Sequence, residues 1–166
     1  TASEAIDDAY RDVRRLLTDF RADRKRDTPL GASLRAYLDV FRRSTGIRAE
    51  LIGEGAVDRL PAGRESELLR MVQEVLANVR KHAGASRVVV TCRSTPEQWE
   101  LTVADDGAGC DPARFEDATG THLGATLLRE RAARMGGQVR LLSHPGEGAT
   151  VVITVPSTSI HERSTT

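Results

Sequence analysis

The chain has 166 residues, a length that suits one domain with a sizeable hydrophobic core. Its 24 Lys and Arg balance its 24 Asp and Glu, so no net field draws the chain to nucleic acid or to an acidic membrane surface. No apolar run approaches the ~20 residues of a membrane span, and no signal peptide is visible. Cys92 and Cys110 lack CxxC spacing, which indicates free thiols and a cytoplasmic location.

The first segment predicts an amphipathic helix with a heptad-like seam. Its apolar residues recur in steps of four and three among charged residues: Ile6, Tyr10, Val13, Leu17 and Phe20. One helix cannot bury such a seam by itself, so partner helices are expected, unless the helix folds back onto the domain. Because the chain starts inside this pattern without an initiator Met, we interpret it as a piece of a longer protein. A charged linker follows and ends at Pro29.

From Pro29 onward the pattern is that of an α+β domain. Helical periodicity predicts a helix marked by Leu34 to Phe41 that stops at Gly46, and two more helices over Ser66–His82 and Leu123–Met135. Alternating or β-branched runs predict strands at Ile47–Ile52, Arg87–Cys92, Trp99–Val103, Gln138–Ser143 and Thr150–Val155. Gly53–Gly63 is expected to be a loop, and the polar tail after Pro156 to be disordered. Sequence neighbours should pair in the sheet, with the helices on one face.

Two polar residues share one side of the second long helix. Glu74 and Asn78 are four apart, so they project from one face, and Asn is a poor helix former that needs a specific bond. Mg²⁺ takes one or two protein oxygens together with phosphates and waters, and Asn78 could supply such an oxygen. Lys81 and His82, a turn later, could reach the phosphates. The alternative is a solvated polar helix face.

A glycine-containing acidic segment directly follows a predicted strand. Asp105 could accept a hydrogen bond from an exocyclic amine, which distinguishes adenine from guanine, while Gly107 and Gly109 permit close approach of backbone to a ligand. The alternative is an ordinary Asp/Gly turn. No GxxxxGK[ST], GxGxxG entering a helix, or HExxH occurs, so common phosphate-loop and zinc-protease sites are excluded.

A third glycine pair precedes the last predicted helix. His122 and Leu123 lie between Gly120 and Gly124, where the first free N–H groups of a helix can form an anion site. The histidines and cysteines are too scattered for a zinc site.

The order of these motifs resembles a known family. QEVLANVRKHAGAS resembles the N-box of sensor histidine kinases, DDGAG the G1 box, THLGATLLRERAARMGG the G2 region, and PGEGATVVITVP the G3 region with its strands. The superfamily is that of gyrase, Hsp90, histidine kinase and MutL. The RER helix and the N-terminal pattern resemble the nitrate-sensor-like subfamily, which partners LuxR-type response regulators. The resemblance covers residues 5 to 156.

The resemblance implies a fold and a division of the chain. The fold would be a two-layer α/β sandwich of the Bergerat type, with a mixed, mostly antiparallel sheet preceded by an N-terminal helix. Residues 1–28 would be the end of the dimerisation and phosphoacceptor region with its linker, 29–156 the ATP-binding catalytic domain, and 157–166 the tail.

It also implies roles for individual residues. Asn78 resembles the Mg²⁺ ligand, Glu74 the N-box acid, and Lys81 and His82 the phosphate-side residues, with Glu74 and Lys81 as the expected catalytic residues. Asp105 resembles the adenine-binding aspartate, supported by Gly107 and Gly109. Around the lid, expected at Asp111–Thr121, further nucleotide contacts would come from His122, Leu123 and Gly124.

The sequence departs from the family pattern at two positions. Ala125 replaces the usual Leu or Met, so the way the lid is anchored is expected to differ from the family pattern. Ala149 stands where a Thr is common, so the hydroxyl near Asp105 is missing or is supplied by Thr150. No phosphoacceptor histidine box is present.

The function expected from the resemblance is that of a catalytic, ATP-binding domain of a two-component sensor histidine kinase. With ATP and Mg²⁺ it would transfer the γ-phosphoryl to a histidine on an upstream helix, for relay to a regulator aspartate. Its full-length parent would be a homodimer through the N-terminal helical region, with no nucleic acid and no direct membrane contact through this fragment; a membrane anchor elsewhere in the parent stays open. The alternatives are an anti-sigma-factor-type serine kinase and a non-catalytic nucleotide-binding or dimerisation module.

Overall fold

A computed structural model describes residues 29–111 and 123–157 of the chain. Four predicted features lie outside these ranges: the helix over Ile6–Phe20, the lid except for its first residue Asp111, the residue His122, and the tail beyond Ser157. Five strands form one mixed sheet in the order β1-β2-β3-β5-β4. Their bounds are Arg48–Ile52 for β1, Arg87–Ser94 for β2, Gln98–Asp105 for β3, Gln138–Ser143 for β4 and Ala149–Pro156 for β5. Only the β1–β2 pair among these is parallel.

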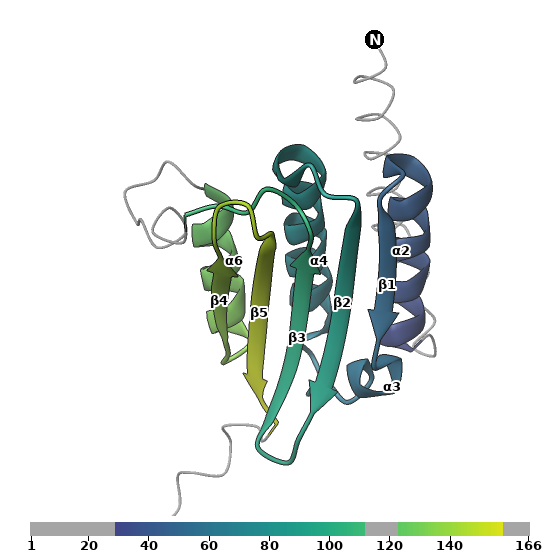
Figure 1. The fold of residues 1–166 in the computed structure, drawn as a ribbon. Coiled ribbons are helices and arrows are strands. Elements are labelled where there is room, and N and C mark those ends of the chain that lie inside the picture. Colours follow the sequence, from purple (N-terminus) through teal and green to yellow (C-terminus); the bar gives the residue numbers. More distant parts are fainter. Residues whose placement is uncertain (1–28, 112–122, 158–166) are drawn as a thin grey trace, which may run out of the picture.

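The helices cover one face of the sheet and leave the other open (Figure 1). They are α2 (Leu30–Thr45), the short α3 (Glu54–Val57), α4 (Glu65–Asn78) with a π-helical turn η1 (Val79–Ala83), and α6 (Leu123–Arg134). This two-layer arrangement with a mostly antiparallel sheet confirms the predicted fold class. None of the helices within the described ranges is long and apolar enough to cross a membrane.

The predicted helix before Gly46 is confirmed as α2. Its buried residues include Leu34, Leu38 and Phe41, which follow the helical period and pack onto the sheet. The helix ends because Gly46 adopts φ 75°, a left-handed conformation in which glycine carries no steric penalty, and its N–H closes the last turn on the Arg42 carbonyl.

The prediction of a plain loop over Gly53–Gly63 is wrong, because that segment contains α3. The four residues of this helix are too few to show a period in sequence. Tertiary contact stabilises it: the indole N–H of Trp99 donates to the Ala56 carbonyl at 2.7 Å, and Trp99 itself is fully buried. A distant hydrogen bond therefore supports the short helix where local propensity does not.

The long helix predicted over Ser66–His82 is present, but its last turn is not α-helical. Regular geometry ends at Asn78, and Val79–Ala83 form a π-helical turn that stops at Gly84, with φ 59°. Single π turns inside helices are rare overall, but those that occur often lie at functional sites. Here the change of geometry comes directly after the Asn that the sequence selects as a metal ligand.

The expectation that sequence neighbours pair holds for β1–β2, β2–β3 and β4–β5, but not for the sheet centre. There β3 pairs with β5, and β4 forms an edge of the sheet. After β3 the chain continues through α6 to β4, and β4 and β5 form a hairpin. The second strand of this hairpin, β5, lies between β4 and β3. Consequently the ends of β3 and β4 and the start of β5 lie at the same end of the molecule (Figure 1).

Candidate nucleotide site

Three of the residues predicted on the second long helix line one cavity. Glu74, Asn78 and Lys81 border a hollow of about 110 Å³ on the exposed side of α4. Sequence reasoning missed four further lining residues: Tyr37, Gln73, Ala77 and Arg80. Three of these repeat the four-three spacing of the predicted set, displaced by one position, so the pattern could have indicated them. Tyr37 comes from α2 and only the tertiary structure reveals it.

His82 stands apart from this cavity. It lies in η1 with an exposed side chain and is not among the lining residues. Because η1 has π geometry, positions beyond Asn78 are rotated relative to a regular α-helix. The role of His82 toward phosphates stays a prediction.

The loop from Asp105 to Cys110 is fastened on two sides by hydrogen bonds. On one side, the Ala108 N–H donates to the Ala83 carbonyl at 2.8 Å, which joins the loop to the end of η1. On the other side, the Gly146 N–H donates to the Ala108 carbonyl at 2.6 Å, and the Cys110 N–H donates to Oγ of Ser143 at 2.8 Å. The structure thus brings together three segments that the sequence singles out separately.

The glycines of this loop are required by close backbone contacts. A Cβ at Gly107 would collide with the carbonyl of Ala83, and one at Gly109 would collide with the His144 carbonyl. Gly109 also has φ 65°, a conformation that side chains other than that of glycine rarely adopt. Gly148 in the facing turn abuts the Asp105 carbonyl in the same way. This packing fixes the course of the loop, and the role of Asp105–Gly109 toward a nucleotide stays a prediction.

Asp105 ends β3 on the helix-covered side of the sheet. It is half-buried, opposite Ala149 and beside Val88 in the register. Burial raises the pKa of this carboxyl above its ordinary value, against hydrogen bonds from the backbone of Gly107 and Ala149 that lower it. The Gly107 N–H donates to Oδ1 at 2.9 Å. A partly desolvated carboxylate with a fixed orientation is suited to accept from an amine of a bound base.

The neighbouring Asp106 has a structural role that the sequence did not indicate. Its carboxylate accepts the N–H groups of Ser86 and Arg87, each at 2.8 Å, and the Ser86 hydroxyl at 2.6 Å. The Ser86 side chain and these backbone groups hold the pKa of Asp106 down, to about 2. The exposed Asp106 therefore joins the start of β2 to the glycine loop, while Asp105 points toward the helix layer.

The remaining predicted site residues have different outcomes. Leu123 and Gly124 form the first turn of α6, where the sequence predicts a helix to begin, and their roles toward a nucleotide stay predictions; His122 lies outside the described residues. Thr150 pairs with Ala104, one position away from the Asp105–Ala149 pair. Because side chains alternate across a strand, Thr150 projects to the open face. The prediction that Thr150 supplies a hydroxyl to Asp105 is therefore wrong, and Ala149 leaves that position without one.

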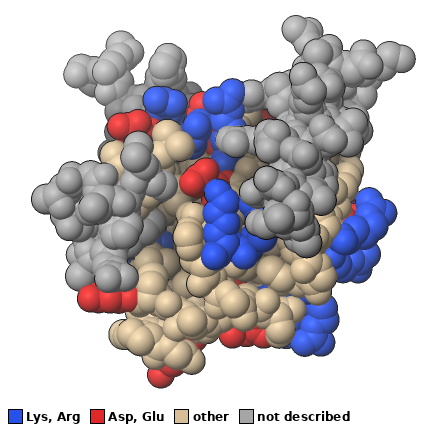
Figure 2. Space-filling model, turned by 90° about the horizontal axis from the view of Figure 1, so that it is seen from above, with Lys and Arg blue, Asp and Glu red and all other residues tan. Residues whose placement is uncertain are grey.

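These features gather at one end of the molecule. Figure 2 shows this end from above, where Lys and Arg side chains lie close to Asp and Glu side chains between the residues drawn in grey. Within the described ranges, no group of three His, Cys, Asp or Glu side chains could hold a metal ion. The exposed Asn78 and the half-buried Glu74 border the same cavity. An amide oxygen and a carboxylate are a donor set that fits Mg²⁺ when phosphates and waters complete its shell.

Comparison with known proteins identifies the family. Residues 63–159 match the family described as histidine kinase-, DNA gyrase B- and HSP90-like ATPase. This match covers more than half of the chain, so the chain belongs to this family, as the motif order predicted.

Curated relatives are sensor kinases. The chain is 32% identical over 148 residues to the signal transduction histidine-protein kinase/phosphatase DegS of Brevibacillus brevis, covering 89% of this chain and 38% of that protein. It is 33% identical over 151 residues to the nitrate/nitrite sensor protein NarQ of Escherichia coli, covering 90% of this chain and 26% of that protein. The chain thus spans well under half the length of these relatives.

Solved structures show the same fold. The ATP binding domain of PrrB from Mycobacterium tuberculosis superimposes with a TM-score of 0.58 at 27% identity, over 75% of this chain and 90% of that domain. A histidine kinase domain from Erythrobacter litoralis gives the same TM-score at 23% identity, over 77% of this chain and 61% of that one, which supports the fold alone.

Proposed function

We propose that this chain binds Mg·ATP as the catalytic domain of a two-component sensor histidine kinase. The observation that carries the proposal is the hydrogen-bonded joint of the Asp105–Cys110 loop with η1 and with the 144–148 turn. That joint sets an oriented, half-buried carboxylate at the same end of the fold as the cavity bordered by Glu74 and Asn78. A nucleotide needs both an amine acceptor and a metal and phosphate side, and this end offers both.

Each residue then has a distinct role. Asp105 accepts a hydrogen bond from the adenine amine, and the packed Gly107 and Gly109 keep the loop against η1 and the facing turn so that the carboxylate holds its direction. Asn78 and Glu74 would hold Mg²⁺, which neutralises phosphate charge when bound. Lys81 binds phosphate oxygens from the same cavity.

The γ-phosphoryl acceptor in this proposal is a histidine on a helix that precedes the chain in the full-length kinase. The full-length protein would be a homodimer through its N-terminal helical region, would reside with this domain in the cytoplasm, and would pass the phosphoryl to a LuxR-type response regulator. The motif resemblance and the sensor-kinase names of the relatives support these assignments. The same names favour a histidine kinase over the serine kinase of anti-sigma-factor type.

A titration tests nucleotide binding. Calorimetry with Mg·ATP should give saturable binding to the unmutated chain, and Asn78→Ala should weaken it strongly. The variant should keep its thermal stability, because Asn78 is exposed and Ala is the better helix former. Arg70→Ala, at an exposed position of α4 outside the cavity, is the matched control and should bind like the parent. Unchanged Mg·ATP affinity in Asn78→Ala would overturn the metal assignment.

The kinase assignment needs a separate experiment. The chain is mixed with labelled Mg·ATP and a polypeptide that carries the upstream acceptor helix, and acid-labile phosphohistidine is measured. Transfer should be slow, because the effective concentration given by the covalent link is lost. Label on His82 of the chain itself would show that the acceptor is misplaced. Binding without any transfer to the acceptor helix would favour the non-catalytic nucleotide-binding module.

A further inference from the structure

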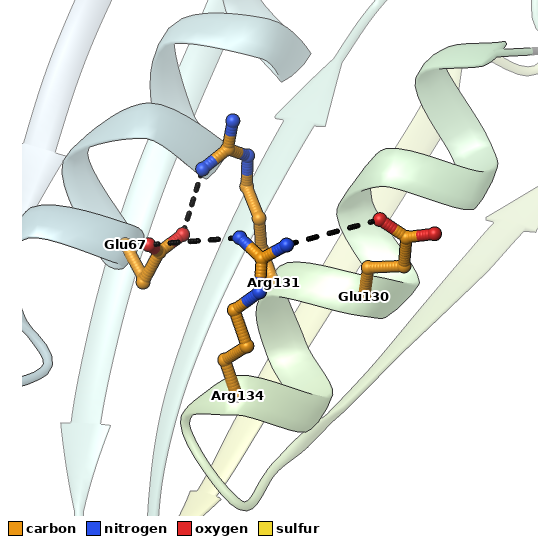
Figure 3. Close-up of polar contacts among 4 residues, drawn as sticks. All are labelled: Glu67, Glu130, Arg131 and Arg134. Carbon is orange, nitrogen blue, oxygen red and sulfur yellow. Dashed lines mark hydrogen bonds and ion pairs between the residues drawn. The ribbon is translucent and has the colours of Figure 1, made fainter.

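Helices α4 and α6 are joined by polar contacts at the end of the molecule opposite the Asp105–Cys110 loop. Nη1 of Arg131 in α6 donates a hydrogen bond to Oε2 of Glu67 in α4, with a nitrogen–oxygen distance of 2.7 Å. Arg134 lies 4.0 Å from Glu67 and from Glu130. Figure 3 draws these contacts between the two helices. One turn earlier in the chain, Nε of Arg64 donates to the Met135 carbonyl at 2.8 Å. The start of α4 therefore meets the end of α6, and the two helices run antiparallel.

Of the ion pairs in Figure 3, only one is shielded from water. The side chains of Arg131 and Glu67 are 13% and 25% exposed, whereas that of Arg134 is 58% exposed. Exposed pairs at 4.0 Å contribute little, while a short charge-assisted hydrogen bond between partly buried groups is directional and stronger. Arg131–Glu67 is thus the ion pair, of the three, that can fix how the helices are aligned, together with the Arg64–Met135 hydrogen bond at their ends.

The spacing of residues along both helices gives that alignment a consequence. Seven residues make nearly two turns, so they return to the same side of a helix after roughly 10 Å. Seven residues after Glu67 in α4 comes Glu74, and seven residues before Arg131 in α6 comes Gly124. Since the helices are antiparallel, both steps lead in the same direction from the ion pair. The first turn of α6 therefore lies at the level of Glu74 in α4, and Asn78 follows one turn farther on.

We infer that Glu67 and Arg131 are positioning residues for nucleotide binding: their ion pair sets the axial register of α6 against α4, and so the level of the Gly124 backbone beside Glu74 and Asn78. The inference rests on the proposed nucleotide site. Neither residue touches the cavity, and both act through the helices that carry them.

The apolar contacts between the helices do not set this register by themselves. The buried residues of α6 that pack on the core include Leu128, Ala132 and the following Met135. Burial of apolar surface is non-directional, so it depends less on particular atomic partners than an ion pair does. A salt bridge with defined donor and acceptor atoms does not tolerate a shift of one turn.

The experiment is a double-mutant cycle with two readouts. Glu67→Gln, Arg131→Gln and the double variant are compared with the parent for Mg·ATP affinity by calorimetry, at a temperature where thermal unfolding shows each variant to be folded. Arg131→Lys keeps the charge without the planar fork and tests partial rescue. Asp39→Asn is the matched control, because Asp39 forms an exposed ion pair with Arg42 within α2 and does not touch α6.

Each single variant should weaken Mg·ATP binding about fivefold to tenfold, and the double variant no more than either single one, because the two residues act as one unit. Arg131→Lys should recover part of the loss, and Asp39→Asn should bind like the parent. Lower melting temperatures with unchanged ATP affinity in both single variants would overturn the inference and leave a purely stabilising ion pair. If a single variant fails to fold, the double variant and Arg131→Lys decide. Failure of the parent itself to bind ATP would instead refute the proposed function.

Discussion

The hydroxyl of Ser143 donates to the carbonyl of Gly148 at 2.8 Å and, on its other side, accepts the N–H of Cys110. Ser143 is the last residue of β4 and is 5% exposed. One buried hydroxyl thus closes the turn after β4 and ties it to the loop that carries Asp105. Sequence reasoning assigned no role to Ser143, because a serine at a strand end shows no partner until the loop returns beside it.

Ser143→Ala should therefore lower the free energy of unfolding by about 1–3 kcal/mol, the range expected when buried groups lose their hydrogen-bond partner. Urea denaturation measures this change. ATP affinity should also fall, because the Cys110 N–H loses its anchor. Ser44→Ala is the control: its hydroxyl donates to the Phe41 carbonyl of the same helix, α2. Equal effects of the two substitutions would contradict the assignment.

Gly107→Ala should impair nucleotide binding far more than Gly55→Ala. A Cβ at Gly107 would strike the backbone of Ala83, so the glycine loop and η1 must separate, whereas a Cβ at Gly55 would meet open space in α3. Gly55→Ala should leave stability unchanged or raise it, since Ala favours helix by ~1 kcal/mol over Gly. Thermal unfolding and ATP titration of both variants make the comparison, and matched behaviour would refute the contact.

The ATP affinity of the parent should decline at acid pH because Asp105 must be ionised to accept from adenine. Burial holds the pKa of Asp105 above its ordinary value of 3.8, so the carboxylate is lost earlier on acidification than at an exposed aspartate. Asp105→Asn should reduce affinity at neutral pH by about tenfold, since hydrogen bonds to charged groups contribute ~1.5–3 kcal/mol.

Titration of ATP itself cancels in the ratio of parent to Asp105→Asn affinities measured at each pH. That ratio should fall toward one as the pH drops through the pKa of Asp105. A ratio independent of pH, or equal binding of ATP and GTP by the parent, would show that Asp105 does not contact the base.

Asp106 should influence stability in acid rather than nucleotide affinity. Its pKa in the folded chain is about 2, below the ordinary value of 3.8, so its ionised form stabilises the fold. That contribution is complete above the ordinary pKa and is lost as the pH falls from about 4 to about 2. Urea denaturation across this range should show a shallower decline for Asp106→Asn than for the parent. Parallel curves would mean that the hydrogen bonds to Ser86 and Arg87 do not stabilise the fold.

Regular elements were predictable because their periods are local. The repeat of Leu68, Val72 and Val75 defines α4, and the alternation from Trp99 to Val103 defines β3. The ordered motifs around Asn78 and Asp105 likewise pointed to the family, which the comparison confirms.

Features that depend on pairs distant in sequence were not predictable. The insertion of β5 beside β3 and the hydrogen bond that Ser143 accepts from the Cys110 N–H each depend on such a partner. The mistaken assignment of Thr150 had the same origin. Whether Ala149 or Thr150 faces Asp105 is set by the register of β5 on β3, and a shift of one residue exchanges the two faces.

The single tryptophan of the chain gives an internal optical reporter. Trp99 is the second residue of β3 and Asp105 the last, so six residues of extended strand, roughly 20 Å, separate the indole from the nucleotide end. The indole is fully buried and donates its N–H to Ala56 in α3. Its fluorescence should be that of an apolar environment, should follow unfolding of the core, and should remain constant when nucleotide binds. Intrinsic emission can therefore monitor folding during a ligand titration without interference from occupancy of the site.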